Sequence, residues 1–166
     1  VYVDDAFEYH YKEKNSNIFE KNYCHIMDNS SRIAMIRYGT AFPDDISNTE
    51  VYNLEDHLGS SSVRLDTNGA VIDKEEYYPF GDSSLRTFDK KRYRFTGKEK
   101  DSESGLYYFG ARYYAAWTCR FISVDPKAKQ SDYQSSYAYG DNNPVMMNDP
   151  SGNQSEEQVS GSSKSN

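Results

Sequence analysis

The amino-acid sequence predicts an all-β protein made of short antiparallel strands and hairpins. In short runs, aromatic and β-branched residues alternate with polar ones, a pattern typical of half-buried strands. Residues that favour turns, such as Asn68-Gly69 and Pro79-Phe80-Gly81, separate these runs. Apolar residues show no long stripe at the helical period, so we expect at most one short helical turn, between Pro126 and Tyr137.

The N-terminal part of the chain is expected to form the first strands. Between Val1 and Arg37, aromatic residues at positions 2, 7, 9 and 11 alternate with polar or charged ones. A further run, 32–39, is rich in apolar residues and ends at a glycine. Positions 40–49 contain Pro43 and several Asp, Asn and Ser residues, which predicts a loop.

The clearest hairpin lies in the middle of the chain. One strand is expected at Ser61–Leu65 and its partner at Ala70–Tyr78, joined by a turn in which Asn68 and Gly69 tolerate positive φ. The second strand should stop at 79–81, because proline cannot donate to a strand ladder and glycine releases the chain.

A second strand pair is expected further along. Positions 92–96 and 106–114 predict two strands, with a charged turn region over 97–105 between them. In a continuous strand 106–114, alternate residues face opposite sides, which puts large side chains on both faces. Such a strand is covered on both sides or packs inside a curved shell.

Composition sets limits on function. A chain of 166 residues is long enough for one domain. Its 16 Tyr and 8 Phe can build a core from amphipathic aromatic rings in place of aliphatic side chains. The formal net charge of −7 disfavours binding to nucleic acid. The basic cluster at 89–94 is interpreted as a solvated turn.

Other features point away from membranes, metals and cofactors. No segment predicts a membrane span or a signal peptide, so we expect any export signal to lie upstream of Val1. Cys24 and Cys119 fit no metal-ligand pair and are compatible with two buried thiols or with one long-range disulfide. His10 and His25 lack the neighbouring ligands of a metal site. We therefore expect neither a metal ion nor another cofactor.

An ordered series of short motifs runs from Asp56 to Gly152. The first group, up to Gly81, contains DHLGS, VR and EYYPFG. The second group, from Arg94 onward, contains RFTGKE, GLYY, ARYY, RFIS, DP, NNPV and DPSG. In order and approximate spacing, over about 53–152, the series resembles the RHS repeat-associated core of RHS/YD-repeat proteins. The run at 32–35 also resembles the last repeat-like strand that precedes this core.

The resemblance implies that the chain is part of a spiralling YD-repeat shell of β-strands. Repeat-like strands are then expected at 1–52 and the core at 53–152, while the polar composition of 153–166 predicts a flexible tail. The implied partners are upstream YD/RHS repeats of the same or a longer chain, with an enclosed C-terminal toxin as a further candidate. The protein is expected to be bacterial, and secreted or exposed at the cell surface.

The resemblance also implies one candidate catalytic site. Some members release their C-terminal region by self-cleavage just beyond the terminal Asp-Pro-x-Gly motif, through an aspartic-protease-like site. Such chemistry needs one carboxylate as acid and another as base. The candidates are Asp125 and Asp149, with Arg112 and Arg120 as supporting charge partners. The alternative for an Asp-Pro pair is a turn cap, in which the carboxylate accepts backbone N–H groups.

Three departures from the family pattern bear on this site. Asn153 follows Gly152, where self-cleaving relatives usually carry a hydrophobic residue. Positions 115–117 read Ala-Ala-Trp, where the family usually has Asp-Pro and a hydrophobic residue. Cys119 stands where glycine often precedes the arginine, so the turn geometry near Arg120 is expected to differ.

We carry three functional hypotheses from the sequence. The leading one is a structural segment that closes the shell and has no catalysis of its own. The alternative is an autoproteolytic core that uses Asp125 and Asp149. The third is a cell-surface or carbohydrate-binding module, motivated by exposed tyrosines. A catalytic dyad of Asp56 and His57 is not expected, because adjacent residues on a strand point to opposite faces.

Overall fold

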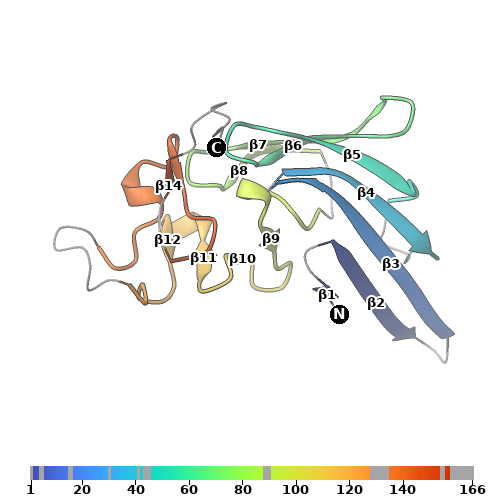
Figure 1. Ribbon diagram of the computed structural model, residues 1–166, viewed down its shortest axis with the longest axis horizontal. Coiled ribbons are helices and arrows are strands. Elements are labelled where there is room, and N and C mark those ends of the chain that lie inside the picture. Colours follow the sequence, from blue (N-terminus) through green and yellow to red (C-terminus); the bar gives the residue numbers. More distant parts are fainter. Residues whose placement is uncertain are drawn as a thin grey trace, which may run out of the picture.

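The computed structural model describes residues 2–3, 6–14, 17–29, 31–40, 42, 46–87, 91–127, 135–153 and 156–157. These residues form strands β1 (Tyr2–Val3), β2 (Phe7–Lys14), β3 (Asn17–Asp28), β4 (Ser31–Gly39), β5 (Glu50–Glu55), β6 (Ser61–Leu65), β7 (Val71–Tyr77), β8 (Ser83–Arg86), β9 (Glu99–Lys100), β10 (Tyr107–Tyr108), β11 (Tyr113–Ala115), β12 (Arg120–Phe121), β13 (Met147–Asn148) and β14 (Glu156–Glu157). Short 3-10 turns are η1 (Phe95–Gly97), η2 (Ala116–Thr118) and η4 (Gly140–Asn142). The predicted all-β fold is confirmed (Figure 1). Within the described residues, no helix is long and apolar enough to cross a membrane.

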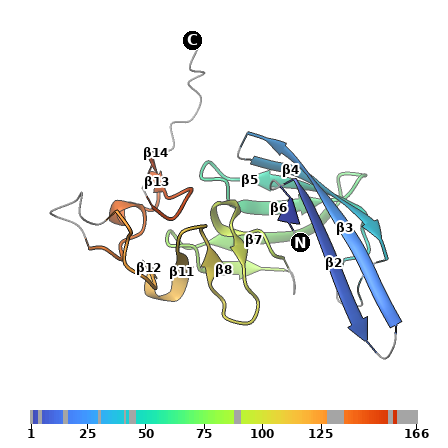
Figure 2. The same ribbon diagram turned by 60° about the horizontal axis from the view of Figure 1, so that its bottom comes forward.

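The first eight strands form one antiparallel sheet in which each strand pairs with the next along the chain. Strands β2 and β3 pair without a bulge, from Phe7 opposite Cys24 to Lys14 opposite Asn17. The strands expected before Arg37 and at 32–39 are confirmed, as is the break in strand structure before β5 at its described positions. Figure 2 shows β2 and β3 as long ribbons that cross the direction of β6 and β7.

The hairpin predicted in the middle of the chain is confirmed, with β6 and β7 as its arms. The Asp66 carboxylate accepts the backbone N–H groups of Asn68 and Ala70, each at 2.8 Å. Gly69 takes the positive φ of 78° that the turn requires. Strand β7 then ends at Tyr77, and Gly81, with φ 86°, closes the following turn.

The two faces of this sheet differ in chemistry and in exposure. On one face, which we call the inner face, charged and aromatic side chains such as Glu8, Lys21, Tyr23 and Asp73 are buried. On the opposite, outer face, large apolar side chains are exposed; they are Phe7, Tyr11, Ile18, Ile26, Tyr52, Leu54, Val71 and Leu85. The usual arrangement of apolar inside and polar outside is thus reversed in this sheet.

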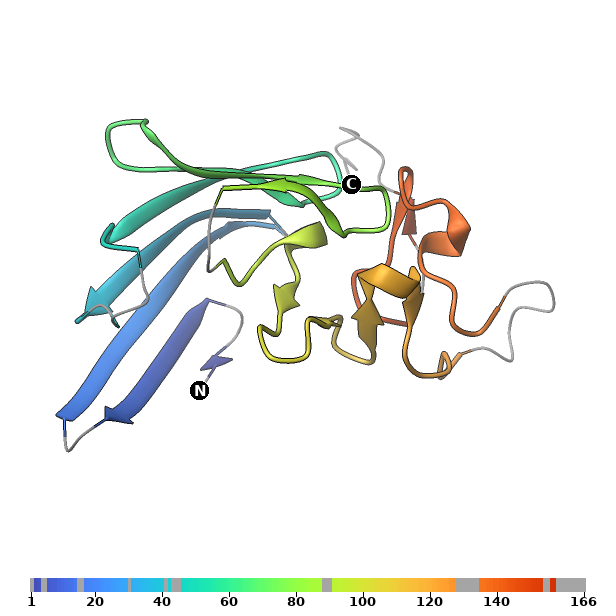
Figure 3. The same cartoon turned by 180° about the vertical axis from the view of Figure 1, so that it is seen from behind.

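Residues 91–105 cover part of the inner face. This segment carries η1 and β9 and lies beneath the strands of the sheet in both Figure 1 and Figure 3. Its backbone reaches the sheet directly, because the N–H of Ser61 donates to the carbonyl of Arg94 at 3.1 Å. The N–H of Thr96 donates to the Ser60 hydroxyl at 3.1 Å. A segment that follows the sheet in sequence therefore turns back onto it.

The second predicted strand pair is wrong in two respects. Positions 92–96 do not form a strand, because Tyr93 makes an isolated bridge to Glu99 and the chain then turns at Thr96, with φ 46°. Positions 106–114 are not one continuous strand but a hairpin, in which β10 pairs with β11. The chain reverses at Gly110, with φ 88°, which is a conformation that glycine adopts without strain.

This reversal changes which side chains are buried. Tyr107 and Tyr114 lie opposite each other in the hairpin and are both fully buried, whereas the paired Tyr108 and Tyr113 are exposed. The four-stranded sheet β12-β11-β10-β9 thus has one covered face and one exposed face. A single strand with large side chains packed on both faces was predicted, and this is wrong. The structure has a hairpin whose large side chains are buried on one face and exposed on the other.

The core is a cluster of aromatic rings, as the composition predicts. Its members are Phe95, Tyr107, Phe109, Tyr114, Phe121 and Tyr139, packed with Ala116. The rings of Tyr114 and Tyr139 are closest, with centroids 4.6 Å apart. Two of the hydroxyl groups donate to the backbone, that of Tyr114 to the Phe80 carbonyl at 2.8 Å and that of Tyr107 to the Gly81 carbonyl at 3.2 Å. The amphipathic ring therefore supplies both the packing and the polar contact.

Two predicted segments lie mostly outside the described residues. The short helical turn expected between Pro126 and Tyr137 includes 128–134, which are outside them. The flexible tail expected at 153–166 also falls largely outside, and the part of it that is described includes β14, which pairs with β13. Cys24 and Cys119 are both described, and each is a free, half-buried thiol.

Candidate functional site

Arg112 joins the two carboxylates that the sequence singles out. It follows the turn at Gly110, and its Nη2 lies 3.2 Å from Asp125 Oδ2 and 3.0 Å from Asp149 Oδ2. The side chains of Arg112 and Asp149 are 2% and 1% exposed, whereas that of Asp125 is 22% exposed. The structure therefore brings three of the four predicted site residues together, with one carboxylate buried and one reachable by solvent.

The same guanidinium also holds the backbone of the Asp-Pro-Ser-Gly turn. Arg112 Nε donates to the Gly152 carbonyl, and its Nη1 donates to the Ser136 carbonyl at 3.3 Å. The carbon atom Cζ of Arg112 lies 3.7 Å from the centre of the Phe121 ring, at the distance of a cation–π contact. Arg112 thus ties the turn at 149–152 to the aromatic core.

Both carboxylates also cap turns, which is the alternative role expected of Asp-Pro pairs. Asp149 Oδ1 accepts the N–H of Gly152 at 2.8 Å and that of Asn153 at 3.1 Å. Asp125 Oδ1 accepts the N–H of Lys127 at 2.7 Å. Both carboxylates contact the shared guanidinium, so the geometry is that of an arginine-bridged pair.

The remaining predicted residues lie elsewhere. Arg120 donates from Nη1 to the Ser135 hydroxyl at 3.1 Å and forms no ion pair with a described carboxylate. His57 is paired through Nε2 with the Val145 carbonyl at 2.9 Å. The Asp56 carboxylate accepts backbone N–H groups of Leu58 and Ser60 instead of contacting that ring.

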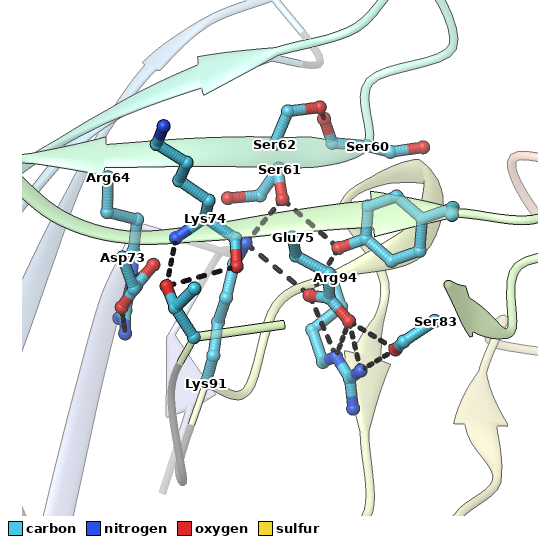
Figure 4. Close-up of polar contacts among 12 residues, drawn as sticks. Ser60, Ser61, Ser62, Arg64, Asp73, Lys74, Glu75, Ser83, Lys91 and Arg94 are labelled. Atoms are coloured by element: carbon cyan, nitrogen blue, oxygen red, sulfur yellow. Dashed lines mark hydrogen bonds and ion pairs between the residues drawn. The ribbon is translucent and has the colours of Figure 1, made fainter. Parts of the chain in front are cut away.

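A second set of buried charges lies on the inner face of the sheet. Glu75 of β7 accepts hydrogen bonds from Arg94 Nε at 2.8 and 3.0 Å, from Ser83 at 2.6 Å and from Tyr77 at 2.7 Å. Lys91 Nζ lies 3.5 Å from the same carboxylate (Figure 4). Burial raises the pKa of Glu75, but the bonds from Arg94, Ser83 and Tyr77 outweigh it and hold that pKa below its usual value.

Lys91 and a neighbouring ion pair extend this network. Burial lowers the pKa of Lys91 to about 8, against the opposing field of Glu75. Arg64 Nε donates to both carboxylate oxygens of Asp73, at 3.0 and 2.9 Å. Figure 4 shows Asp73 and Glu75 on one side of β7 and the Lys74 side chain on the other. The alternation of the strand places these charges on the inner face.

Glu8 of β2 is the centre of a third buried set. His25 Nδ1 accepts from Arg32 Nε at 3.0 Å, so its Nε2 carries the proton and donates to Glu8 at 2.9 Å. Arg92 and Tyr93 donate to the same carboxylate from the segment that covers the sheet. Burial raises the pKa of Glu8, but these donors and His10 outweigh it and hold that pKa far below its usual range.

Neither buried network on the inner face is predicted from the sequence. The cluster at 89–94 was expected to be a solvated turn, and this is wrong for its described residues Lys91 and Arg94, which are 7% and 5% exposed. The physical reason is that their partners Glu75 and Ser61 lie on the sheet, and a charge is buried only when such partners are in place. One feature of the sequence could have indicated these networks. Four basic residues are concentrated in five positions, 90–94, of a chain that is acidic overall.

Several known proteins resemble this chain in sequence or in structure. The chain is 38% identical over 117 residues to the toxin subunit YenC1 of Yersinia entomophaga, across 66% of this chain and 12% of that protein. It is 39% identical over 94 residues to the tRNA nuclease WapA of Bacillus subtilis, across 52% of this chain and 4% of that protein. The crystal structure of TcdB2-TccC3 matches with a TM-score of 0.77 and 32% identity, over 89% of this chain and 7% of that one.

These comparisons and the fold define a class of protein domain, the RHS-type β-shell segment, which the toxin subunit YenC1 and TcdB2-TccC3 also contain. No protein-family model matches the chain. By its similarity to these relatives and its sheet architecture, the chain belongs to the RHS-repeat family. It spans about an eighth or less of the length of the relatives that it matches.

Proposed function

We propose that this chain is the structural segment that closes the β-shell of a secreted or surface-exposed bacterial RHS-type toxin protein. The observation that carries the proposal is the return of residues 91–105 onto the inner face of the sheet, where Arg94 pairs with Glu75 and Arg92 pairs with Glu8. A chain that leaves the last strand of a curved sheet and packs against its inner face ends the spiral at that point. The relatives that are toxin subunits support the context.

The proposal assigns a part to each segment. Positions 1–52 are repeat-like strands that continue upstream YD/RHS repeats, 53–152 are the closing core, and 153–166 are the polar C-terminal tail. The eight-stranded sheet runs through position 52 without a break, so the repeat-like strands and the core share one sheet. Beyond the core, we infer an enclosed C-terminal toxin region as the partner of the inner face.

A chimera tests the closing role. The matching segment of TccC3 is replaced by residues 1–152 of this chain, the product is purified with TcdB2, and limited proteolysis compares digestion of the region that follows. We expect that region to be digested at the same rate in the chimera and in the parent complex. A matched chimera with Glu75→Ala loses the buried partner of Arg94 and should be digested faster.

Two outcomes of the chimera experiment bear against the proposal. If the chimera binds TcdB2 but its downstream region is digested many times faster than in the parent, the chain does not close a shell. If the Glu75→Ala chimera is digested no faster than its parent chimera, the return of 91–105 onto the sheet is not the closing element.

Self-cleavage is the second candidate function, and the contacts of Arg112 favour it. One guanidinium contacts Asp125, Asp149 and the carbonyl of Gly152, so both candidate carboxylates lie near the Asp-Pro-Ser-Gly turn. Against it stands the bridging position of Arg112, since an aspartic-protease pair needs its two carboxylates to act on one water. We therefore propose the structural role ahead of the catalytic one.

Intact mass separates the two functions. A reporter domain is fused after Asn166, and the purified protein is compared with its Asp125→Asn and Asp149→Asn variants. The structural role predicts the full-length mass in all three proteins. Loss of the reporter from the parent but from neither variant would establish self-cleavage by this pair and would replace the structural proposal.

A further inference from the structure

A cavity lies between the inner face of the sheet and the segment 91–105 that covers it. Its volume is about 550 Å³, within the range of cavities that hold a ligand of drug size. Seven of the 19 Lys and Arg residues of the chain line it, against two carboxylates, Glu99 and Asp101. The chain as a whole carries a net charge of −7, so basic residues are concentrated in the lining of this cavity.

Five of the seven cations are held by partners in the wall. They are Arg32, Arg64, Lys91, Arg92 and Arg94, with the contacts described above. Their carboxylate, imidazole and carbonyl partners fix the position of each charged group. These residues therefore form a rigid, hydrogen-bonded wall rather than a set of mobile side chains.

The other two cations, Arg86 of β8 and Lys100 of β9, are different. In the described part of the chain, neither forms a hydrogen bond or ion pair with a carboxylate. Lys100 Nζ lies 4.9 Å from the centre of the Tyr107 ring. Burial lowers the pKa of Lys100, and the positive charges of Arg94 and Arg86 lower it further, against Asp82 and Glu75. Like charges thus converge here, and a bound anion would relieve their repulsion.

The rest of the lining narrows the class of ligand. Tyr23, Met35 and Ile46 add aromatic and aliphatic surface to the same cavity. A single phosphate ion would leave this surface and most of the volume unused. A short peptide that carries carboxylates beside an apolar side chain matches both the cations and the apolar wall.

We propose that this cavity binds an acidic peptide segment, with its carboxylates at Arg86 and Lys100 and an apolar side chain against Tyr23 and Met35. The proposal concerns the chemistry of the ligand and does not depend on whether the chain closes a shell. Each carboxylate contact is charge-assisted, a class of hydrogen bond whose loss weakens binding by about tenfold or more. Binding should also weaken as salt is raised, because part of the attraction is electrostatic.

Fluorescence anisotropy of the whole chain with defined probes tests the proposal. The probe is a fluorescein-labelled octapeptide of alternating glutamate and leucine, and its counterpart carries glutamine in place of glutamate. The protein is compared with Arg86→Gln, Lys100→Gln, the double variant and the conservative Lys100→Arg. The matched control is Lys74→Gln, which removes an exposed cation on the other side of β7.

The expected result is saturable binding of the glutamate peptide alone. Each single Gln variant should weaken it by about tenfold and the double variant by about 100-fold, while Lys100→Arg and Lys74→Gln leave it unchanged. Arg86 is exposed and outside the core, so a melting temperature near that of the parent would show that the variants fold.

Three results would overturn the proposal. They are equal binding of the glutamine peptide, unchanged binding by the folded double variant, and tighter binding of an eight-nucleotide single-stranded DNA than of the glutamate peptide. The third would assign the cations to phosphates instead. Competition by millimolar inorganic phosphate separates a general anion site, which phosphate empties, from the peptide site proposed here, which keeps its peptide.

Discussion

The carboxylate of Glu75 and the guanidinium of Arg94 form a buried ion pair that joins the sheet to the segment covering it. The side chains are 0% and 6% exposed, and two hydrogen bonds from Arg94 Nε reach the two carboxylate oxygens at 2.8 and 3.0 Å. Such a pair contributes little net free energy relative to an apolar pair, but removing one partner leaves the other buried and uncompensated.

Glu75→Gln should therefore destabilise the protein strongly. The variant keeps the shape of the side chain but leaves Arg94 and Lys91 without their common carboxylate. We expect the free energy of unfolding to fall by about 3–5 kcal/mol, measured by urea denaturation at pH 7. The matched variant Glu76→Gln changes an exposed neighbour on the same strand and should stay within about 0.5 kcal/mol. Equal effects of the two variants would contradict the role of the pair.

Glu8 should make stability depend on pH in the acid range. Its pKa in the folded protein lies below the ordinary value of 4.5, so the unfolded chain takes up the proton first as the pH falls. The stabilisation by this carboxylate is therefore fully present above pH 4.5 and is lost progressively below it.

The measurement compares the parent with Glu8→Gln across pH 7 to 3. At pH 7 we expect the variant to be less stable by about 3 kcal/mol, and this difference should shrink below pH 4.5. Glu13→Gln, on the exposed end of the same strand, should be close to the parent at pH 7. A difference between parent and Glu8→Gln that stays constant down to pH 3 would disprove the linkage.

Gly81 is expected to tolerate no side chain. Its φ is 86°, and a Cβ atom placed there overlaps the ring of Phe95. Gly81→Ala combines overpacking with a strained backbone and should cost about 3 kcal/mol. Gly69 has a similar φ of 78° but no atom within 4 Å of an added Cβ, so Gly69→Ala should cost about 1 kcal/mol. Thermal unfolding measures the loss of stability in each variant. The difference between the two losses is the cost of the overlap with the Phe95 ring.

Cys119 offers a substitution that should stabilise the protein. It has φ 60° and ψ 29°, the left-handed conformation at the end of η2. Cys119→Gly removes this strain and should raise the free energy of unfolding by about 1 kcal/mol. Cys24→Gly, in the middle of β3, should have the opposite sign because glycine weakens a strand interior. A loss of stability in both variants would show that the Cys119 side chain matters more than its backbone.

The parts of the fold that depend on neighbours in sequence were predictable. The hairpin β6–β7 follows from alternation in both strands and from the turn formed by Asp66 and Gly69, all within about 17 residues. The strand predicted at 106–114 is wrong because the turn within it depends on a single residue. Gly110 turns 106–114 into a hairpin, yet one glycine inside a run of aromatic residues is also compatible with an interrupted strand.

The buried charge networks depend on contacts between distant segments. Lys91, Arg92 and Arg94 look like a solvated turn in sequence because Glu8 and Glu75 lie far away along the chain. In the candidate site, the expectation that Arg112 accompanies Asp125 and Asp149 rested on the family resemblance, and the structure places it between them. No periodicity or spacing in the sequence indicates that one guanidinium contacts both carboxylates.

The contacts of Glu8 also determine when the first strands can complete their folding during protein synthesis. Arg92 and Tyr93 are 84 and 85 positions further along, so the ribosome must add both before the carboxylate has its full set of donors. At a synthesis rate of about 5–20 residues per second, the first strands wait roughly 4–17 seconds for their last partners. During this interval their charged face is open to water, and the nascent meander behaves as an unfinished sheet that only later translation can complete.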